Sequence, residues 1–176
     1  MASILNVDQI NNAAGTSAIT IDSNGNPHMA GHVVQTSSLT RVQNLQVTVT
    51  TTSFTALGNG VITSITPKFS NSMFRVVFNH QTSASSSSYL AVALYTSVNG
   101  GAYTNANSML PSSWWGGTNH WASMSLDQII TPTYTLGDTI SFQPYYRNYS
   151  STTTYFGWGS SSPGSELQIY CQEIAQ

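Results

Sequence analysis

The stretch Tyr89-Leu-Ala-Val-Ala-Leu-Tyr95 is apolar or aromatic at every position, and it lies between a run of serines and the turn-forming Asn99-Gly-Gly101. Its length fits a β-strand, since such strands span about 4–8 residues and helices at least about 10. A strand that is apolar on both faces has to be covered on both faces. The stretch therefore predicts a central strand with protein packed on either side.

Shorter strands with one apolar face are predicted on both sides of this run. In each of them apolar and polar residues alternate, as between Phe74 and Asn79. No window keeps apolar residues at helical spacing, and turn signals separate the alternating segments. This pattern is typical of sandwiches and barrels, and we predict an all-β fold, a jelly-roll-like antiparallel β-sandwich, for residues 32–176. Pro144 lies inside one of the runs and predicts an edge strand or a bulge, because proline has no N–H to donate.

Residues 1–31 differ in character and form the second predicted unit. The residues Ser17-Ala-Ile-Thr-Ile-Asp22 have the pattern of a strand, and Ser23-Asn-Gly-Asn26 offers a hairpin turn, since Asn-Gly adopts positive φ easily. A segment this short is not stable alone. We therefore predict an extended N-terminal β-hairpin arm for attachment or trimerisation, whose apolar residues are buried by a partner: Ile4, Leu5, Val7, Ile19 and Ile21.

The low charge of the chain excludes some partners and favours others. Only 6% of the residues are charged, whereas the sequence holds 27 serines and 22 threonines. The 4 Lys and Arg residues are too few and too scattered for a basic patch, so we predict no nucleic-acid partner. No apolar run approaches the ~20 residues of a membrane span, so we predict no membrane insertion. Nearly neutral surfaces tend to associate, and we predict a homotrimer.

Three stretches in this order are similar to one family of virion proteins. Residues 4–25, Ile-Leu-Asn-Val-Asp-Gln-Ile-Asn-Asn-Ala-Ala-Gly-Thr-Ser-Ala-Ile-Thr-Ile-Asp-Ser-Asn-Gly, resemble a "VDTI…G…TIDSSG" module. The later Ser64-Ile-Thr-Pro67 and the ending Leu167-Gln-Ile-Tyr-Cys-Gln-Glu-Ile-Ala175 are similar to an "SITP" strand end and an "LxxxEIA" terminus. The chain thus resembles structural proteins of the tail-fibre and head-fibre type from tailed phages of aquatic bacteria.

The resemblance has two departures and several implications. Met73-Phe-Arg-Val-Val-Phe78 stands where the family often has Lys and an aliphatic run, and the tryptophan-rich residues 114–121 match nothing in the family pattern. The resemblance implies synthesis in the cytoplasm of a host bacterium and a final location in the virion. It also implies contacts with other virion proteins.

The sequence lacks the usual signatures of catalysis. It contains no G-x-S-x-G elbow, P-loop or H-E-x-x-H motif, and its six carboxylates can be interpreted as caps and turn formers at turns or strand ends. The single cysteine, Cys171, excludes an internal disulfide. His28 and His32 could gather on a threefold axis around a metal, but we favour a structural or solvated role for both. We therefore predict no catalytic residue, no metal and no cofactor.

Aromatic residues are the one feature with binding character. Pro111-Ser-Ser-Trp-Trp-Gly-Gly-Thr-Asn-His-Trp121 has the composition of a loop, and a second cluster is Tyr145-Tyr-Arg-Asn-Tyr149. Aromatic rings beside amides and hydroxyls suit sugar rings and protein hot spots. Equally, the tryptophans could fill the core or a subunit interface. The candidate residues for a receptor, glycan or interface surface are Trp114, Trp115, Trp121, Tyr146 and Tyr149.

These observations lead to three functional hypotheses. The first is a non-enzymatic virion structural protein, a trimeric fibre or tip component that contacts the host surface, with a host glycan as a candidate ligand. The second is a capsid decoration or cement protein, which the short chain favours. The third is a polysaccharide hydrolase, which would need two carboxylates roughly 5–9 Å apart.

Overall fold

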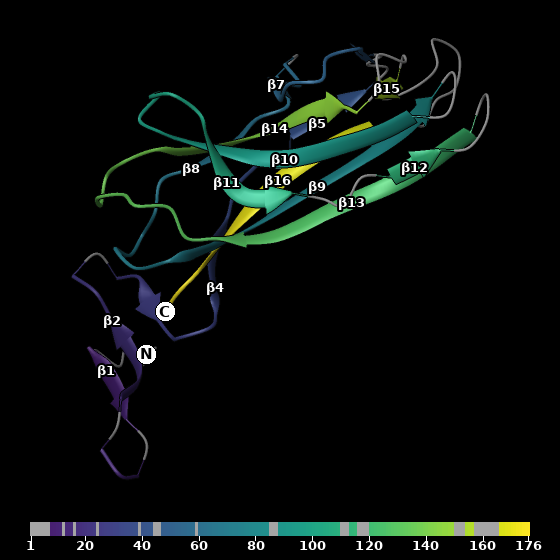
Figure 1. Ribbon diagram of the computed structural model, residues 1–176. Coiled ribbons are helices and arrows are strands. Elements are labelled where there is room, and N and C mark those ends of the chain that lie inside the picture. The colour runs from purple at the N-terminus through teal and green to yellow at the C-terminus, as the bar shows by residue number, and fades with distance from the viewer. Residues whose placement is uncertain are drawn as a thin grey trace.

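The computed structural model describes residues 8–11, 13–15, 17–23, 25–38, 40–43, 47–58, 60–84, 88–109, 113–115, 120–149, 154–156 and 166–176. Within these residues all elements of regular secondary structure are β-strands, and all strand pairs are antiparallel (Figure 1). The strands of the main body pack as two sandwich-like layers. The predicted all-β antiparallel fold is therefore confirmed. No helix in the described ranges is long and apolar enough to cross a membrane.

The first layer is a 6-stranded sheet, in which four strands have the order β11-β10-β14-β7. The other two strands are β12, which pairs with β10, and β8, which pairs with β14. The bounds of its strands are β7 Thr55–Ala56, β8 Thr63–Ile65, β10 Ser88–Val98, β11 Thr104–Met109, β12 Ser113–Trp115 and β14 Ile140–Asn148.

The second layer is a 7-stranded sheet with the order β4-β16-β9-β15-β6. Here β13 also pairs with β9, and β5 pairs with β16. The bounds are β4 Val33–Thr36, β5 Thr40–Gln43, β6 Val47–Val49, β9 Met73–Ala84, β13 His120–Ile130, β15 Thr154–Phe156 and β16 Glu166–Ile174.

A separate small sheet precedes the sandwich. It consists of β1 Gln9–Asn11, β2 Ser17–Ile21 and β3 Pro27–His28 in the order β1-β2-β3. Figure 1 shows β1 and β2 at one end of the molecule, beside the C-terminus, and β12 at the opposite end. Backbone hydrogen bonds between Gly31 and Ala175 and between Ala175 and His32 connect this end of the chain to β16.

The core lies between the two layers, where alternate residues of each strand meet. Phe74 and Phe78 from β9 pack against Leu94 from β10 and Phe142 from β14, and all four are fully buried. Full burial of a large apolar side chain contributes about 1.5–3 kcal/mol to stability. Residues 90–94 of β10 are each no more than 1% exposed, so the predicted strand that is covered on both faces is confirmed.

Pro144 lies in an internal strand, which contradicts the predicted edge strand. β14 pairs along its length with β10, and on its other side it pairs with β7 and β8. Pro144 stands between the residues that pair with β7 and those that pair with β8. Its carbonyl faces that side, where it accepts the N–H of Leu57. The missing N–H of Pro144 therefore falls at a gap in the ladder, and an internal strand tolerates the proline.

A buried carboxylate joins two stretches that lie far apart in the sequence, the loop after β8 and the C-terminal strand β16. Glu173 on β16 is fully buried. Its two oxygens accept hydrogen bonds of 2.6 to 3.1 Å from four groups: the backbone N–H groups of Lys68 and Phe69, the Ser72 hydroxyl and the Gln35 amide. A buried charge is tolerated only when it is satisfied in this way. We refer to Glu173 and these four donors as the Glu173 clamp.

Candidate functional site: an aromatic outer face

The outer face of the six-stranded sheet carries a row of aromatic side chains. Along β14 the side chains alternate, so that Phe142 and Tyr146 are buried in the core whereas Tyr145 and Arg147 lie on the other face. Tyr149 follows directly after β14 and is 52% exposed. On the neighbouring strand β10, the alanines opposite Tyr145 and Arg147 are small and leave room for these larger side chains.

Two tyrosines stack at the centre of this face. The rings of Tyr95 on β10 and Tyr145 on β14 have their centroids 3.8 Å apart with an angle of 15° between their planes. Tyr103, just before β11, lies 6.1 Å from Tyr145. Burial raises the pKa values of Tyr103 and Tyr145, so both phenols are neutral at physiological pH and can donate as well as accept hydrogen bonds.

Arg147 extends the row of rings toward Tyr149. Its guanidinium carbon lies 4.8 Å from the ring centroid of Phe54 and 4.5 Å from that of Tyr149. Its Nη2 also donates a 2.7 Å hydrogen bond to the Tyr149 hydroxyl. Cation–π contacts of this kind hold the side chains in place. We call Phe54, Tyr95, Tyr103, Tyr145, Arg147 and Tyr149 the aromatic face.

The predicted candidates Tyr146 and Tyr149 have different environments. Tyr149 is exposed and belongs to the aromatic face. Tyr146 is only 8% exposed and packs in the core, so its prediction as a surface residue is wrong. The physical reason is the period of two along β14, which places Tyr145, and not Tyr146, on the outside.

Trp114, Trp115 and Trp121 have their backbone in strands, and the prediction of a loop is wrong for these three positions. In β12, Trp114 pairs with Tyr89 and Trp115 with Ser88 of β10. Trp121 pairs with Ser83 of β9 at the start of β13. The orientation of the three side chains, and residues 116–119 between the strands, lie outside what the structure describes.

The register brings the two predicted aromatic clusters to the same end of the sandwich. β10 has Asn148 opposite Leu90 on one side and Trp114 opposite Tyr89 on the other. β12 and the end of β14, which leads into Tyr149, therefore flank the same end of β10. This is the end farthest from the N-terminal sheet (Figure 1).

The predicted arm residues fall partly within the described ranges. Ile19 and Ile21 lie in β2 and are half-buried, whereas Ile10 of β1 is 48% exposed. Ile4, Leu5 and Val7 lie outside the described residues. Since β2 pairs with both β1 and β3, the predicted hairpin has a third short strand.

Besides Glu173, three aspartates in the described residues have hydrogen-bond partners for their carboxylates: Asp22, Asp127 and Asp138. Asp127 forms an ion pair with Arg75 across β13 and β9, and this hydrogen bond lowers the pKa of Asp127. The pKa of Asp138 is lowered by the Thr135 N–H and then by the Asn99 amide. Asp22 accepts the N–H and the amide of Asn26 in a turn. The interpretation of all six as turn or strand-end residues is wrong for Asp127, which pairs within the body of β13, whereas the buried Glu173 lies at the end of β16 as expected.

The two histidines considered for a metal have other surroundings. His28 makes an edge-to-face contact with Phe69, with the ring centroids 4.7 Å apart, and His32 is exposed. Within the described part of one chain, no three His, Cys, Asp or Glu residues group as metal ligands.

No protein-family model matches the sequence, and no curated protein does.

Proposed function

We propose that this chain is a non-enzymatic structural protein of a tailed-phage virion, a trimeric fibre or tip component that binds the host surface through its aromatic face. The observation that carries the proposal is the row of rings from Tyr103 and Tyr95 to Tyr149 on the outside of a rigid sheet. Exposed aromatic residues and arginine are the residue types that dominate binding hot spots. Neutral phenols beside aromatic rings also suit the hydroxyls and apolar faces of a glycan.

The two ends of the molecule support a division of roles. The N-terminal sheet, which contains the exposed Ile10, lies at one end (Figure 1). The end of β14, which leads into Tyr149, pairs with β10 beside β12 and so lies toward the other end. An attachment segment at one end leaves the opposite end free to meet the host. Asp127 and Asp138 are poor candidates for the acid of a glycosidase, because such an acid needs a raised pKa and the pKa values of these two carboxyls are lowered.

The experiment compares two exposed residues at opposite ends in a cell-binding assay with purified protein. We expect Tyr149→Ala to weaken binding to host cells at least tenfold, which corresponds to about 1.4 kcal/mol. Leu136 is 54% exposed and lies beside the N-terminal sheet, so Leu136→Ala serves as the control and should bind like the native protein. Equal binding by both variants would reject the aromatic face as the host contact.

A capsid decoration protein is the second candidate, favoured by exposed apolar residues near the N-terminal sheet. Ile10 and Val33 are 48% and 49% exposed, and a shell surface could cover them. Quantitative mass spectrometry of the virion separates the two: a few to tens of copies support a fibre, and hundreds support a decoration protein. Light scattering tests the trimer, since a stable monomer of 18.9 kDa at micromolar concentration would contradict it.

A further inference from the structure

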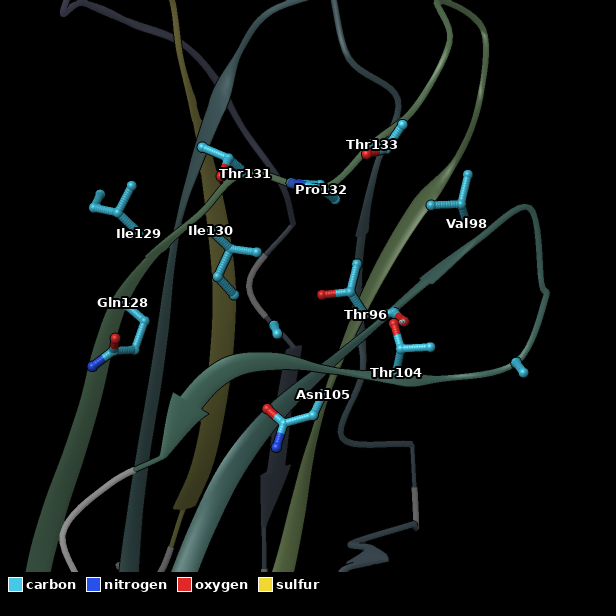
Figure 2. Close-up of a pocket in the computed structure, with 12 residues that line it drawn as sticks. Thr96, Val98, Thr104, Asn105, Gln128, Ile129, Ile130, Thr131, Pro132 and Thr133 are labelled. Atoms are coloured by element: carbon cyan, nitrogen blue, oxygen red, sulfur yellow. Dashed lines mark hydrogen bonds between the residues drawn. The ribbon is translucent and has the colours of Figure 1, made fainter.

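A cleft of about 650 Å³ opens between the two layers at one edge of the sandwich. β11 is the terminal strand of its sheet, and among the described strands β13 pairs only with β9. Figure 2 shows the lining residues coming from β10, β11, β13 and the segment that follows β13. The cleft is separate from the aromatic face, because Thr96 of β10 enters it whereas the adjacent Tyr95 belongs to the outer face.

The lining of the cleft is polar but carries no charged residue. Its polar side chains are four hydroxyls and two amides, which come from Thr96, Thr104, Thr131, Thr133, Asn105 and Gln128. Each of these groups can both donate and accept a hydrogen bond. Ile130, Val98 and Pro132 add apolar surface between them.

The buried side chain of Thr96 is the feature that indicates a binding site in the cleft. The residue is only 7% exposed, and its Oγ1 has no hydrogen-bond partner within the described residues. Figure 2 shows this hydroxyl pointing from β10 into the space toward Ile130. A buried hydroxyl without a partner is costly, and such a group in a native structure calls for a bound molecule or a water.

We propose that the cleft binds a neutral saccharide of one or two rings. Sugar hydroxyls donate and accept, as the threonine and amide groups of the lining do, and their C–H faces match Ile130 and Val98. A charged ligand would enter a site that offers it no counter-charge. The volume lies within the range of small-molecule sites, about 300–1,000 Å³. This site does not depend on the proposed role in the virion.

The experiment titrates the purified full-length protein with maltose, cellobiose and N,N′-diacetylchitobiose, and follows backbone amide shifts by NMR. At least one disaccharide should bind in the millimolar range or tighter, with the largest shifts at residues 96, 104 and 128–133. Thr96→Val keeps the shape and removes the hydroxyl, and it should weaken binding at least fivefold. Thr82→Val is the matched control, because Thr82 is also buried on a strand but lies away from the cleft.

Three outcomes would overturn the proposal. They are the absence of binding by all three disaccharides, equal weakening by Thr96→Val and Thr82→Val, and cleft shifts that follow protein concentration instead of sugar. The last would identify the cleft as a contact between copies of this chain. The cell-binding test of Tyr149→Ala is separate, so failure of the virion proposal would leave a sugar-binding cleft standing.

Discussion

The Glu173 clamp and the Thr96 cleft both bury polar groups between strands, and they differ in how completely these groups are bonded. The Glu173 carboxylate accepts hydrogen bonds from four groups, whereas the Thr96 hydroxyl has no partner among the described residues. A satisfied buried charge holds two segments in one arrangement, whereas an unsatisfied buried hydroxyl beside a cleft calls for a bound molecule or a water. Burial alone therefore does not indicate a site, and the bonding of the buried group separates structure from binding.

The largest effect is expected from removing the carboxylate of the clamp. Glu173→Leu leaves the N–H groups of Lys68 and Phe69 and the Ser72 hydroxyl without their acceptor, so it should lower the free energy of unfolding by about 3–5 kcal/mol. Urea denaturation measures the loss. The control is Asp127→Asn, which weakens an exposed ion pair and should cost much less stability, because exposed ion pairs contribute little. A smaller loss of stability for Glu173→Leu than for the control would contradict the claim that the buried carboxylate holds the two segments together.

The second prediction concerns His80, a buried group whose protonation should affect the stability of the fold. It stacks on Phe78 in the core, and burial lowers its pKa to about 3 from an ordinary value of 6.5. Below pH 6.5, His80 therefore binds a proton in the unfolded chain but stays neutral in the folded protein. Stability falls as the pH falls, by about 1.4 kcal/mol per pH unit, and should be about 2 kcal/mol lower at pH 5 than at neutral pH.

The His80→Leu variant isolates this contribution. Its free energy of unfolding, measured in urea at pH 7 and pH 5, should change by about 2 kcal/mol less than that of the native protein. His32→Gln, which replaces an exposed histidine, serves as the control. If the native protein and His80→Leu lose equal stability between the two pH values, the imidazole is not held neutral by the core.

The smallest effect, and the sharpest test of the comparison, is expected from two buried threonines. The Thr63 hydroxyl bonds to Ser37 Oγ at 2.6 Å, so Thr63→Val should cost about 1–2 kcal/mol. Thr96→Val removes a hydroxyl without a partner and should change the free energy of unfolding by less than about 0.5 kcal/mol. Thermal denaturation of both variants measures the difference. Equal losses would mean that the Thr96 hydroxyl is already satisfied in the folded protein.

Much of the architecture could be predicted from periodicity. The apolar run from Leu90 to Leu94 is the buried centre of β10, and the alternation from Phe74 onward forms β9. The same period, started at Ile140 and Phe142, already assigns Tyr146 to the core and Tyr145 to the outside. The signal for the aromatic face was therefore present along β14, although its partners on other segments were not visible there.

Side-chain period and composition are local properties, so the amino-acid sequence was enough to predict the all-β fold, its central buried strand and the low charge. The folded arrangement was needed to show that Tyr95 stacks on Tyr145, that Arg147 lies over Phe54, and that Glu173 binds the loop at Lys68. It was also needed to show that Pro144 stands in an internal strand. These facts depend on strand order and register, which bring together residues as many as 138 positions apart, as in the hydrogen bond from Gln35 to Glu173. No local pattern specifies such pairings, since they follow from how the two layers close around a shared core.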